Sequence, residues 1–173
     1  MSSEPTVESE FLALIEANRQ RILRICRVYA WTPPDQEDLY QEILFQIWRA
    51  LPNLKAKAHA NTWLYRVAMN TAISFVRKKQ SGGRNDVPVA QEDIKNLVEQ
   101  QQVEAGHNPQ IDRLYDAIAK LDKVEKALVT LFLEDLSYDE MAEVLGLSAS
   151  HVGVMLHRAK KKLSQLMQEE VPS

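Results

Sequence analysis

Seven lysines and arginines lie between positions 55 and 84, a stretch that contains no acidic residue. Such side chains can contact phosphates, a tryptophan can stack on a base, and an asparagine can pair with a base edge. We therefore expect a nucleic-acid contact here, although Trp63 also fits a core position and residues 77–79 also fit a solvated helix end. The candidate residues are Lys55, Asn61, Trp63, Arg66, Asn70, Arg77, Lys78 and Lys79.

A second candidate site follows a capped turn near the C-terminus. Ala142, Gly146 and Val152 have the spacing of a DNA-binding helix-turn-helix, in which a small residue, a turn glycine and a buried valine bring two helices together. The second helix offers polar and basic side chains to a major groove, and the alternative is an ordinary amphipathic bundle helix. Its candidate contact residues are Ser148, Ser150, His151, His157, Arg158 and Lys161.

The helix predicted before the basic stretch has the opposite character. Its outer face is acidic and polar and also carries aromatic side chains. Such a face suits a protein partner with a basic or aliphatic surface, and it does not suit DNA. The candidate protein-contact residues are Asp38, Gln41, Glu42, Phe45 and Trp48.

We expect all three sets of candidate contact residues to lie on helices, because apolar residues recur at helical spacing and no strand pattern competes. The spacing predicts helices over about 8–30, 35–50 and 62–79, with a break at the prolines 33 and 34. Asn108, Asp122 and Ser137 have the spacing of N-caps for later helices. We expect an all-α protein with two helical bundle domains, residues 1–80 and 109–173, joined by a flexible linker at 81–108.

Composition limits the remaining possibilities. The chain has 45% hydrophobic and 26% charged residues and a net charge of −3, as in an ordinary globular protein. It has neither an apolar run of about 20 residues nor a secretory signal, so we expect a cytoplasmic protein without membrane insertion. The single Cys26 fits a core position, and the four histidines have no metal-binding spacing. We therefore expect no metal, no cofactor and no enzymatic activity.

Three stretches of this chain carry a resemblance to a known family. Residues 36–51 contain Asp-Leu-Tyr-Gln-Glu and end in Trp-Arg-Ala-Leu, residues 62–70 read Thr-Trp-Leu-Tyr-Arg-Val-Ala-Met-Asn, and residues 121–163 contain Ser-Tyr-Asp-Glu-Met-Ala and Leu-His-Arg-Ala. Together they resemble the extracytoplasmic-function (ECF) sigma factors of the sigma-70 superfamily. The resemblance implies that residues 1–80 are a region 2-like domain and that residues 109–173 are a region 4-like domain.

This resemblance also implies partners and roles. In the family, the first stretch grips the clamp helices of the polymerase β′ subunit, the second recognises the −10 promoter element, and the third reads the −35 element. The loop before the second stretch, here residues 55–61, captures a flipped base in the family. The implied partners are RNA polymerase core, through the β′ clamp helices and the β flap, promoter DNA, and an anti-sigma factor. The implied function is a non-enzymatic sigma factor for transcription initiation.

One departure from the family pattern concerns the predicted recognition helix. The family usually has Thr-Val-Lys-Ser-Arg-Leu where this chain has His-Val-Gly-Val-Met-Leu at 151–156, so two basic groups are absent. Fewer phosphate contacts should weaken binding of the −35 element. This departure keeps open a sigma mimic that binds an anti-sigma protein, and a two-module helix-turn-helix transcriptional regulator that acts without core polymerase is a further alternative.

Overall fold

The structure, a computed structural model, describes residues 6–54, 59–80 and 108–169. The chain divides into two compact units, residues 1–98 and 99–173, and the described parts of both consist of helices and turns. The predicted all-α fold with two helical domains is confirmed. Nearly all of the predicted linker, residues 81–108, lies outside the described residues.

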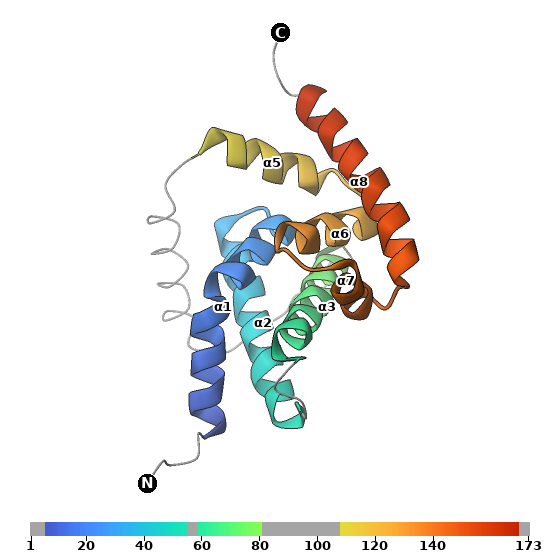
Figure 1. Cartoon of the computed structure of the whole chain (residues 1–173). Coiled ribbons are helices and arrows are strands. Elements are labelled where there is room, and N and C mark those ends of the chain that lie inside the picture. The colour runs from blue at the N-terminus through green and yellow to red at the C-terminus, as the bar shows by residue number, and fades with distance from the viewer. Residues whose placement is uncertain (1–5, 55–58, 81–107, 170–173) are drawn as a thin grey trace. The chain divides into compact units, whose positions relative to one another are not determined.

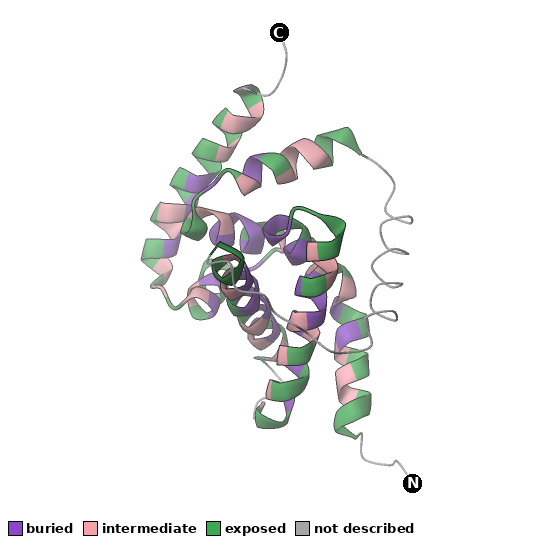
Figure 2. Ribbon diagram, turned by 180° about the vertical axis from the view of Figure 1, so that it is seen from behind, coloured by how far each residue is buried: buried purple, intermediate pink, exposed green. Residues whose placement is uncertain are grey.

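The first unit is built from three long helices, α1 (Val7–Tyr29), α2 (Pro33–Ala50) and α3 (Ala60–Gln80), with a short 3-10 turn η1 (Leu51–Asn53) after α2. Each long helix packs against the other two (Figure 1). Figure 2 shows the buried residues of these helices as purple bands on the ribbon. The fully buried side chains include Ile22, Ile25, Leu39, Ile43, Ile47, Leu64 and Met69.

Helix α2 begins two residues earlier than the sequence predicts. Thr32 caps it by accepting a hydrogen bond from the backbone N–H of Asp35, and Pro33 and Pro34 occupy its first turn. Proline is tolerated there because the first backbone N–H groups of a helix have no partner inside the helix. The two prolines therefore open α2, whereas the sequence pattern predicts a break there and a helix from about residue 35.

The second unit contains α5 (Pro109–Ala119), α6 (Lys123–Leu133), α7 (Tyr138–Leu145) and α8 (Ala149–Glu169). Helix α8 packs against all three of the others (Figure 1). Their shared core is closed by fully buried side chains from every helix, among them Ile118, Leu128, Leu131, Met141, Val152 and Leu156. Asn108, Asp122 and Ser137 cap α5, α6 and α7, as the sequence predicts.

Gly146 makes the turn between α7 and α8. Its φ is +71°, in the left-handed region, and no described heavy atom beyond the glycine and its two chain neighbours lies within 4 Å of the place a Cβ would occupy. We expect Gly146→Ala to lower the free energy of unfolding by about 1 kcal/mol, because only backbone strain is added and no clash. Urea unfolding measures this difference. Gly146→Asn is the control and should lose less, since asparagine tolerates this conformation; equal stability of the alanine variant and the unmodified protein would contradict the left-handed turn.

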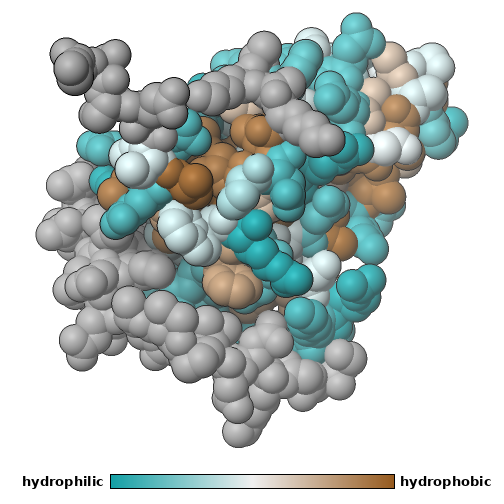
Figure 3. Space-filling view, turned by 90° about the horizontal axis from the view of Figure 1, so that it is seen from below, coloured by the Kyte–Doolittle hydropathy of each residue, from teal (hydrophilic) through white to brown (hydrophobic). Residues whose placement is uncertain are grey.

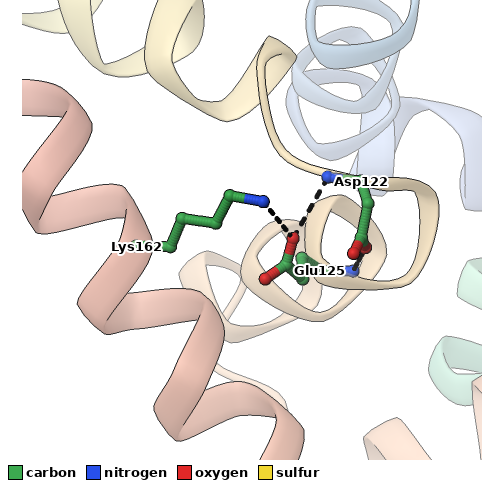
Figure 4. A network of polar contacts seen from close by, with 3 residues as sticks. All are labelled: Asp122, Glu125 and Lys162. Carbon is green, nitrogen blue, oxygen red and sulfur yellow. Dashed lines mark hydrogen bonds and ion pairs between the residues drawn. The ribbon is translucent and has the colours of Figure 1, made fainter.

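A polar network joins α6 to α8 (Figure 4). Asp122 accepts a hydrogen bond from the N–H of Glu125 at 2.8 Å, and the Glu125 carboxylate accepts one from the N–H of Asp122 at 3.2 Å. The same Glu125 oxygen lies 3.1 Å from Nζ of Lys162, a residue of α8. The cap of one helix thus also anchors another helix 37 positions later in the sequence.

The Asp122 cap should give the protein's stability a defined pH dependence. The hydrogen bond from the Glu125 N–H lowers the pKa of Asp122 below its ordinary value of 3.8. The ionised carboxylate therefore stabilises the fold above that ordinary value, and this contribution is lost as the pH falls through the folded-state pKa. Asp122→Asn keeps a capping oxygen but does not titrate. In urea unfolding, the stability difference between the unmodified protein and Asp122→Asn should shrink between pH 6 and pH 3; a constant difference would contradict this assignment.

Candidate nucleic-acid and protein interfaces

Helix α3 gathers four of the predicted nucleic-acid residues into one row. Trp63, Arg66, Asn70 and Arg77 follow one another at intervals of three, four and seven residues, which places them on one face of a helix. Arg66, Asn70 and Arg77 are exposed, and Trp63 is half-buried. The row is about 21 Å long at the usual rise of a helix. It therefore offers two guanidinium groups, an amide and an aromatic ring along one line; we call it the α3 row.

Two other predicted basic residues of α3, Lys78 and Lys79, do not join the row. Nζ of Lys79 lies 3.0 Å from Oδ1 of Asp35, at the start of α2, and 5.6 Å from the centre of the Phe75 ring. Its position is about 200° around the helix from Arg77. Lys79 thus pairs with an acid of α2 while its side chain stays half-exposed, and it lies outside the α3 row. Asn61 is exposed in the first turn of α3, and Lys55 lies outside the described residues.

A polar depression of about 240 Å³ lies between α2 and α3. Lys78 and Asn70 line it from α3, and Glu42 and Gln46 line it from α2. Nε2 of Gln46 donates a hydrogen bond to the Glu42 carboxylate at 3.0 Å, which holds the two α2 side chains together. Lys78 therefore lies toward α2, at the flank of the α3 row.

Helix α2 presents a second row, made of Asp38, Glu42, Phe45 and Arg49 at intervals of four, three and four residues. Asp38, Phe45 and Arg49 are exposed, and Phe45 keeps 49% of its surface accessible. Desolvation raises the pKa of Asp38 from its ordinary value, while the nearby charge of Lys79 lowers it. This α2 row is an aromatic ring set among charges of both signs. Arg49 was not among the predicted residues, although its four-residue spacing from Phe45 was a usable signal.

Trp48 lies on the flank of this row and packs against α1. Its ring meets Phe11 edge to face, with centroids 5.1 Å apart, yet it remains 43% exposed. Leu12 of α1 is 58% exposed, so α1 as well as α2 contributes apolar surface to the first unit. Brown apolar areas among teal hydrophilic ones are visible on the face drawn in Figure 3.

The structure corrects one of the predicted protein-contact residues. Gln41 is only 5% exposed, and its Oε1 has no hydrogen-bond partner within the part of the chain that the structure describes. A buried amide cannot reach a partner protein without a rearrangement, so Gln41 does not belong to the α2 row.

Helices α7 and α8 form the predicted helix-turn-helix. Ser137 and Glu140 make a complete capping box at the start of α7, and Val152 is fully buried between the two helices. Oγ of Ser148 accepts a hydrogen bond from the N–H of His151 at 3.2 Å, so Ser148 acts as the cap of α8. The first turn of α8 is thereby fixed relative to α7, as a groove-reading helix requires.

The outer face of α8 keeps most of the predicted contact residues in one stripe. Ser150, His151, His157, Arg158 and Lys161 are all exposed. Two further lysines of α8, Lys160 and Lys162, contact the bundle instead. Lys160 lies 4.5 Å from the centre of the Phe132 ring, and Lys162 pairs with Glu125. All four cations are exposed, but Lys160 and Lys162 contact the bundle while Arg158 and Lys161 lie on the outer stripe, a difference that a count of charges cannot show.

Three further observations concern metal ligands, membrane-spanning helices and the single cysteine. Among the described residues, no group of three His, Cys, Asp or Glu side chains is placed to hold a metal ion. No helix in the same ranges is long and apolar enough to cross a bilayer. Cys26 is 1% exposed, and its burial raises the pKa of the thiol far above the ordinary value, which makes it a core residue.

Comparisons with known proteins agree with these two units. The family described as Sigma-70 region 2 matches residues 14–82, and the family described as Sigma-70, region 4 matches residues 111–163. The ECF RNA polymerase sigma factor SigW of Bacillus subtilis is 24% identical over 172 residues, covering 94% of this chain and 91% of the relative. RNA polymerase sigma factor SigZ of the same organism is 29% identical over 133 residues, covering 76% and 72%.

Two solved structures share the fold. CnrH, solved in complex with the cytosolic domain of CnrY, superposes with a TM-score of 0.65 at 22% identity, covering 93% of this chain and 89% of CnrH. The sigma factor RpoE of Bartonella quintana, solved with the anti-sigma factor NepR, gives a TM-score of 0.67 at 16% identity, covering 95% and 98%.

Proposed function

The chain belongs to the sigma-70 family, in its ECF class, and from this premise we propose which of its surfaces contacts which part of the initiation complex. As a sigma factor it directs RNA polymerase to promoters and takes part in transcription initiation. The observation that carries the proposal is the separation of the two rows of the first unit onto different helices. We further infer that the chain acts by binding alone, without making or breaking a bond.

The α2 row is the proposed contact with core polymerase. Phe45 is a large aromatic side chain that is half-exposed within a polar and charged surrounding. Residues of this kind are typical anchors of protein interfaces, where a polar rim excludes water from the aromatic centre. The exposed surface of Trp48, steadied by Phe11, extends the same apolar area. In the family, the matching stretch binds the clamp helices of the β′ subunit.

The α3 row is the proposed contact with the −10 element. Arg66 and Arg77 can pair with phosphates, Trp63 can stack on an unpaired base, and Asn70 can form hydrogen bonds with a base edge. The cost of unstacking a base, a few kcal/mol, must be met by such contacts. Binding should therefore depend strongly on salt, because each phosphate contact releases counterions.

Helix α8 is the proposed contact with the −35 element. Its capped first turn offers Ser150 and His151 to base edges, while Arg158 and Lys161 lie further along the same face and suit phosphates. We also propose that an anti-sigma protein binds this chain, because the sigma factor RpoE was solved with the anti-sigma factor NepR, and CnrH was likewise solved with the cytosolic domain of another protein. The proposed place of action is the cytoplasm, where RNA polymerase transcribes.

Reconstituted transcription tests this function. Purified full-length protein is added to core RNA polymerase with a library of DNA fragments, and transcript start sites are mapped. We expect specific start sites that disappear when the protein is omitted. A regulator that acts without core would fail to bind core in a pull-down, and a sigma mimic would bind an anti-sigma protein yet yield no specific transcript; either result would overturn the proposal.

A further inference from the structure

An exposed valine lies in the middle of the polar face of α8. Val154 keeps 53% of its surface accessible, whereas Val152, two residues earlier, is fully buried. The surface neighbours of Val154, three and four positions away on either side, are Ser150, His151, His157 and Arg158, and all of them are exposed and polar. Single exposed apolar residues are common on proteins. This one is notable because it occupies the centre of the face proposed to enter the groove.

The residue before it, Gly153, leaves room for an aromatic ring. A Cβ at position 153 would lie 3.4 Å from Cε2 and 3.6 Å from Cδ2 of Tyr138, the first residue of α7. A Cβ alone would just touch the ring, whereas the atoms of a longer side chain would have to pass around it. Tyr138 lies beside the backbone of α8 and keeps 46% of its surface exposed. The ring therefore borders the path of any side chain longer than alanine at position 153, including the lysine that the family usually has there.

Gly153 and Val154 both lower the stability of α8. A glycine inside a helix costs about 1 kcal/mol relative to alanine, and a β-branched valine also lowers helix propensity. Neither loss is offset by burial of Val154, because its side chain points to solvent. A contact outside the chain would supply a reason for an aliphatic side chain at this place.

The major groove offers such a contact. An aliphatic side chain can neither donate nor accept a hydrogen bond, and the apolar group that B-DNA presents there is the C5 methyl of thymine. Val154 is the sixth residue of α8 and so lies in its first two turns, the part of a recognition helix that contacts base edges. We propose that Val154 is a specificity-determining residue that reads a thymine methyl in the −35 element. This inference rests on the function proposed above.

Replacement of thymine by deoxyuridine removes only that methyl and provides the test. Promoters are first selected with the reconstituted holoenzyme from a library randomised in the upstream element. Each thymine of the selected element is then replaced singly by deoxyuridine on either strand, and holoenzyme binding is measured. At one thymine we expect about a fourfold loss of affinity, the effect of burying one methyl-sized group. With Val154→Ser, the same replacement should change affinity by less than about 1.5-fold.

Two control variants make the outcome specific to the methyl contact. Val154→Thr retains one methyl group and should keep the sensitivity to deoxyuridine. Val124→Ser alters another exposed valine, on α6, and should leave the sensitivity to deoxyuridine unchanged. Equal sensitivity in Val154→Ser, or no sensitive thymine in the selected element, overturns this inference while the transcripts from unmodified promoters still support the proposed function. Absence of transcripts from every unmodified promoter overturns the proposed function itself.

Discussion

Reversing Arg66 and Arg77 to glutamate should lower promoter-specific transcription at least 100-fold while leaving core polymerase binding unchanged. Both guanidinium groups are exposed on the α3 row, so their replacement removes no contact from the hydrophobic core of the first unit. A hydrogen bond to a charged group contributes about 1.5–3 kcal/mol, and the loss of two corresponds to a factor of 100 or more. Run-off transcription and a core-binding assay, performed on the same preparations, measure the two effects.

The salt dependence of promoter binding identifies the lost contacts as phosphate contacts. Each phosphate contact to a single strand contributes about 0.7 to the slope of log affinity against log salt, so the double variant should lower that slope by about 1.4. Arg24→Glu with Arg27→Glu reverses the same number of exposed charges on α1 and is the matched control. Equal losses in both double variants would show that the net charge of the unit matters and that the α3 row does not.

Phe45→Ala should weaken binding to core polymerase at least 30-fold. Truncation of an aromatic anchor at an interface typically costs 2 kcal/mol or more. The stability of the free protein should change little, because Phe45 is half-exposed and contributes little to the core of the first unit. Competition with a labelled sigma factor for purified core measures the affinity, and thermal unfolding of the free variant verifies the fold.

A second exposed aromatic residue supplies the control for Phe45. Trp31 is 77% exposed between α1 and α2 and lies outside the α2 row. Trp31→Ala should leave core binding within about twofold, well below the loss expected for an anchor. If Trp31→Ala weakened core binding as much as Phe45→Ala, the interface would lie at the corner of α1 and α2, and the α2 row would be the wrong surface.

The elements and their caps could be predicted because they depend on local sequence. The spacing of apolar residues indicates each long helix, and Asn108, Asp122 and Ser137 each satisfy a backbone N–H only a few positions away. The start of α2 at Pro33 was missed, because proline breaks one helix and opens another with equal ease. The choice between these two roles depended on the Thr32 cap.

The surroundings of individual site residues could not be predicted in the same way. Gln41 is buried and Lys79 pairs with Asp35 because of the way α1, α2 and α3 pack together. The packing of one helix against another cannot be predicted from the local spacing of residues. Lys162 likewise meets Glu125, 37 positions away in the sequence. Helical spacing nevertheless contains information that was not used, since it places Arg49 on the α2 row and Val154 in the middle of the α8 face.

Site-specific photocrosslinking tests the division of labour between α2 and α3 most directly. A photoreactive amino acid replaces Phe45 in one variant and Asn70 in another, and each is assembled with core polymerase and promoter DNA before irradiation. We expect the probe at position 45 to label a polymerase subunit and the probe at position 70 to label the −10 region of the DNA. Labelling of DNA from position 45, or of polymerase alone from position 70, would contradict the assignment of the two rows.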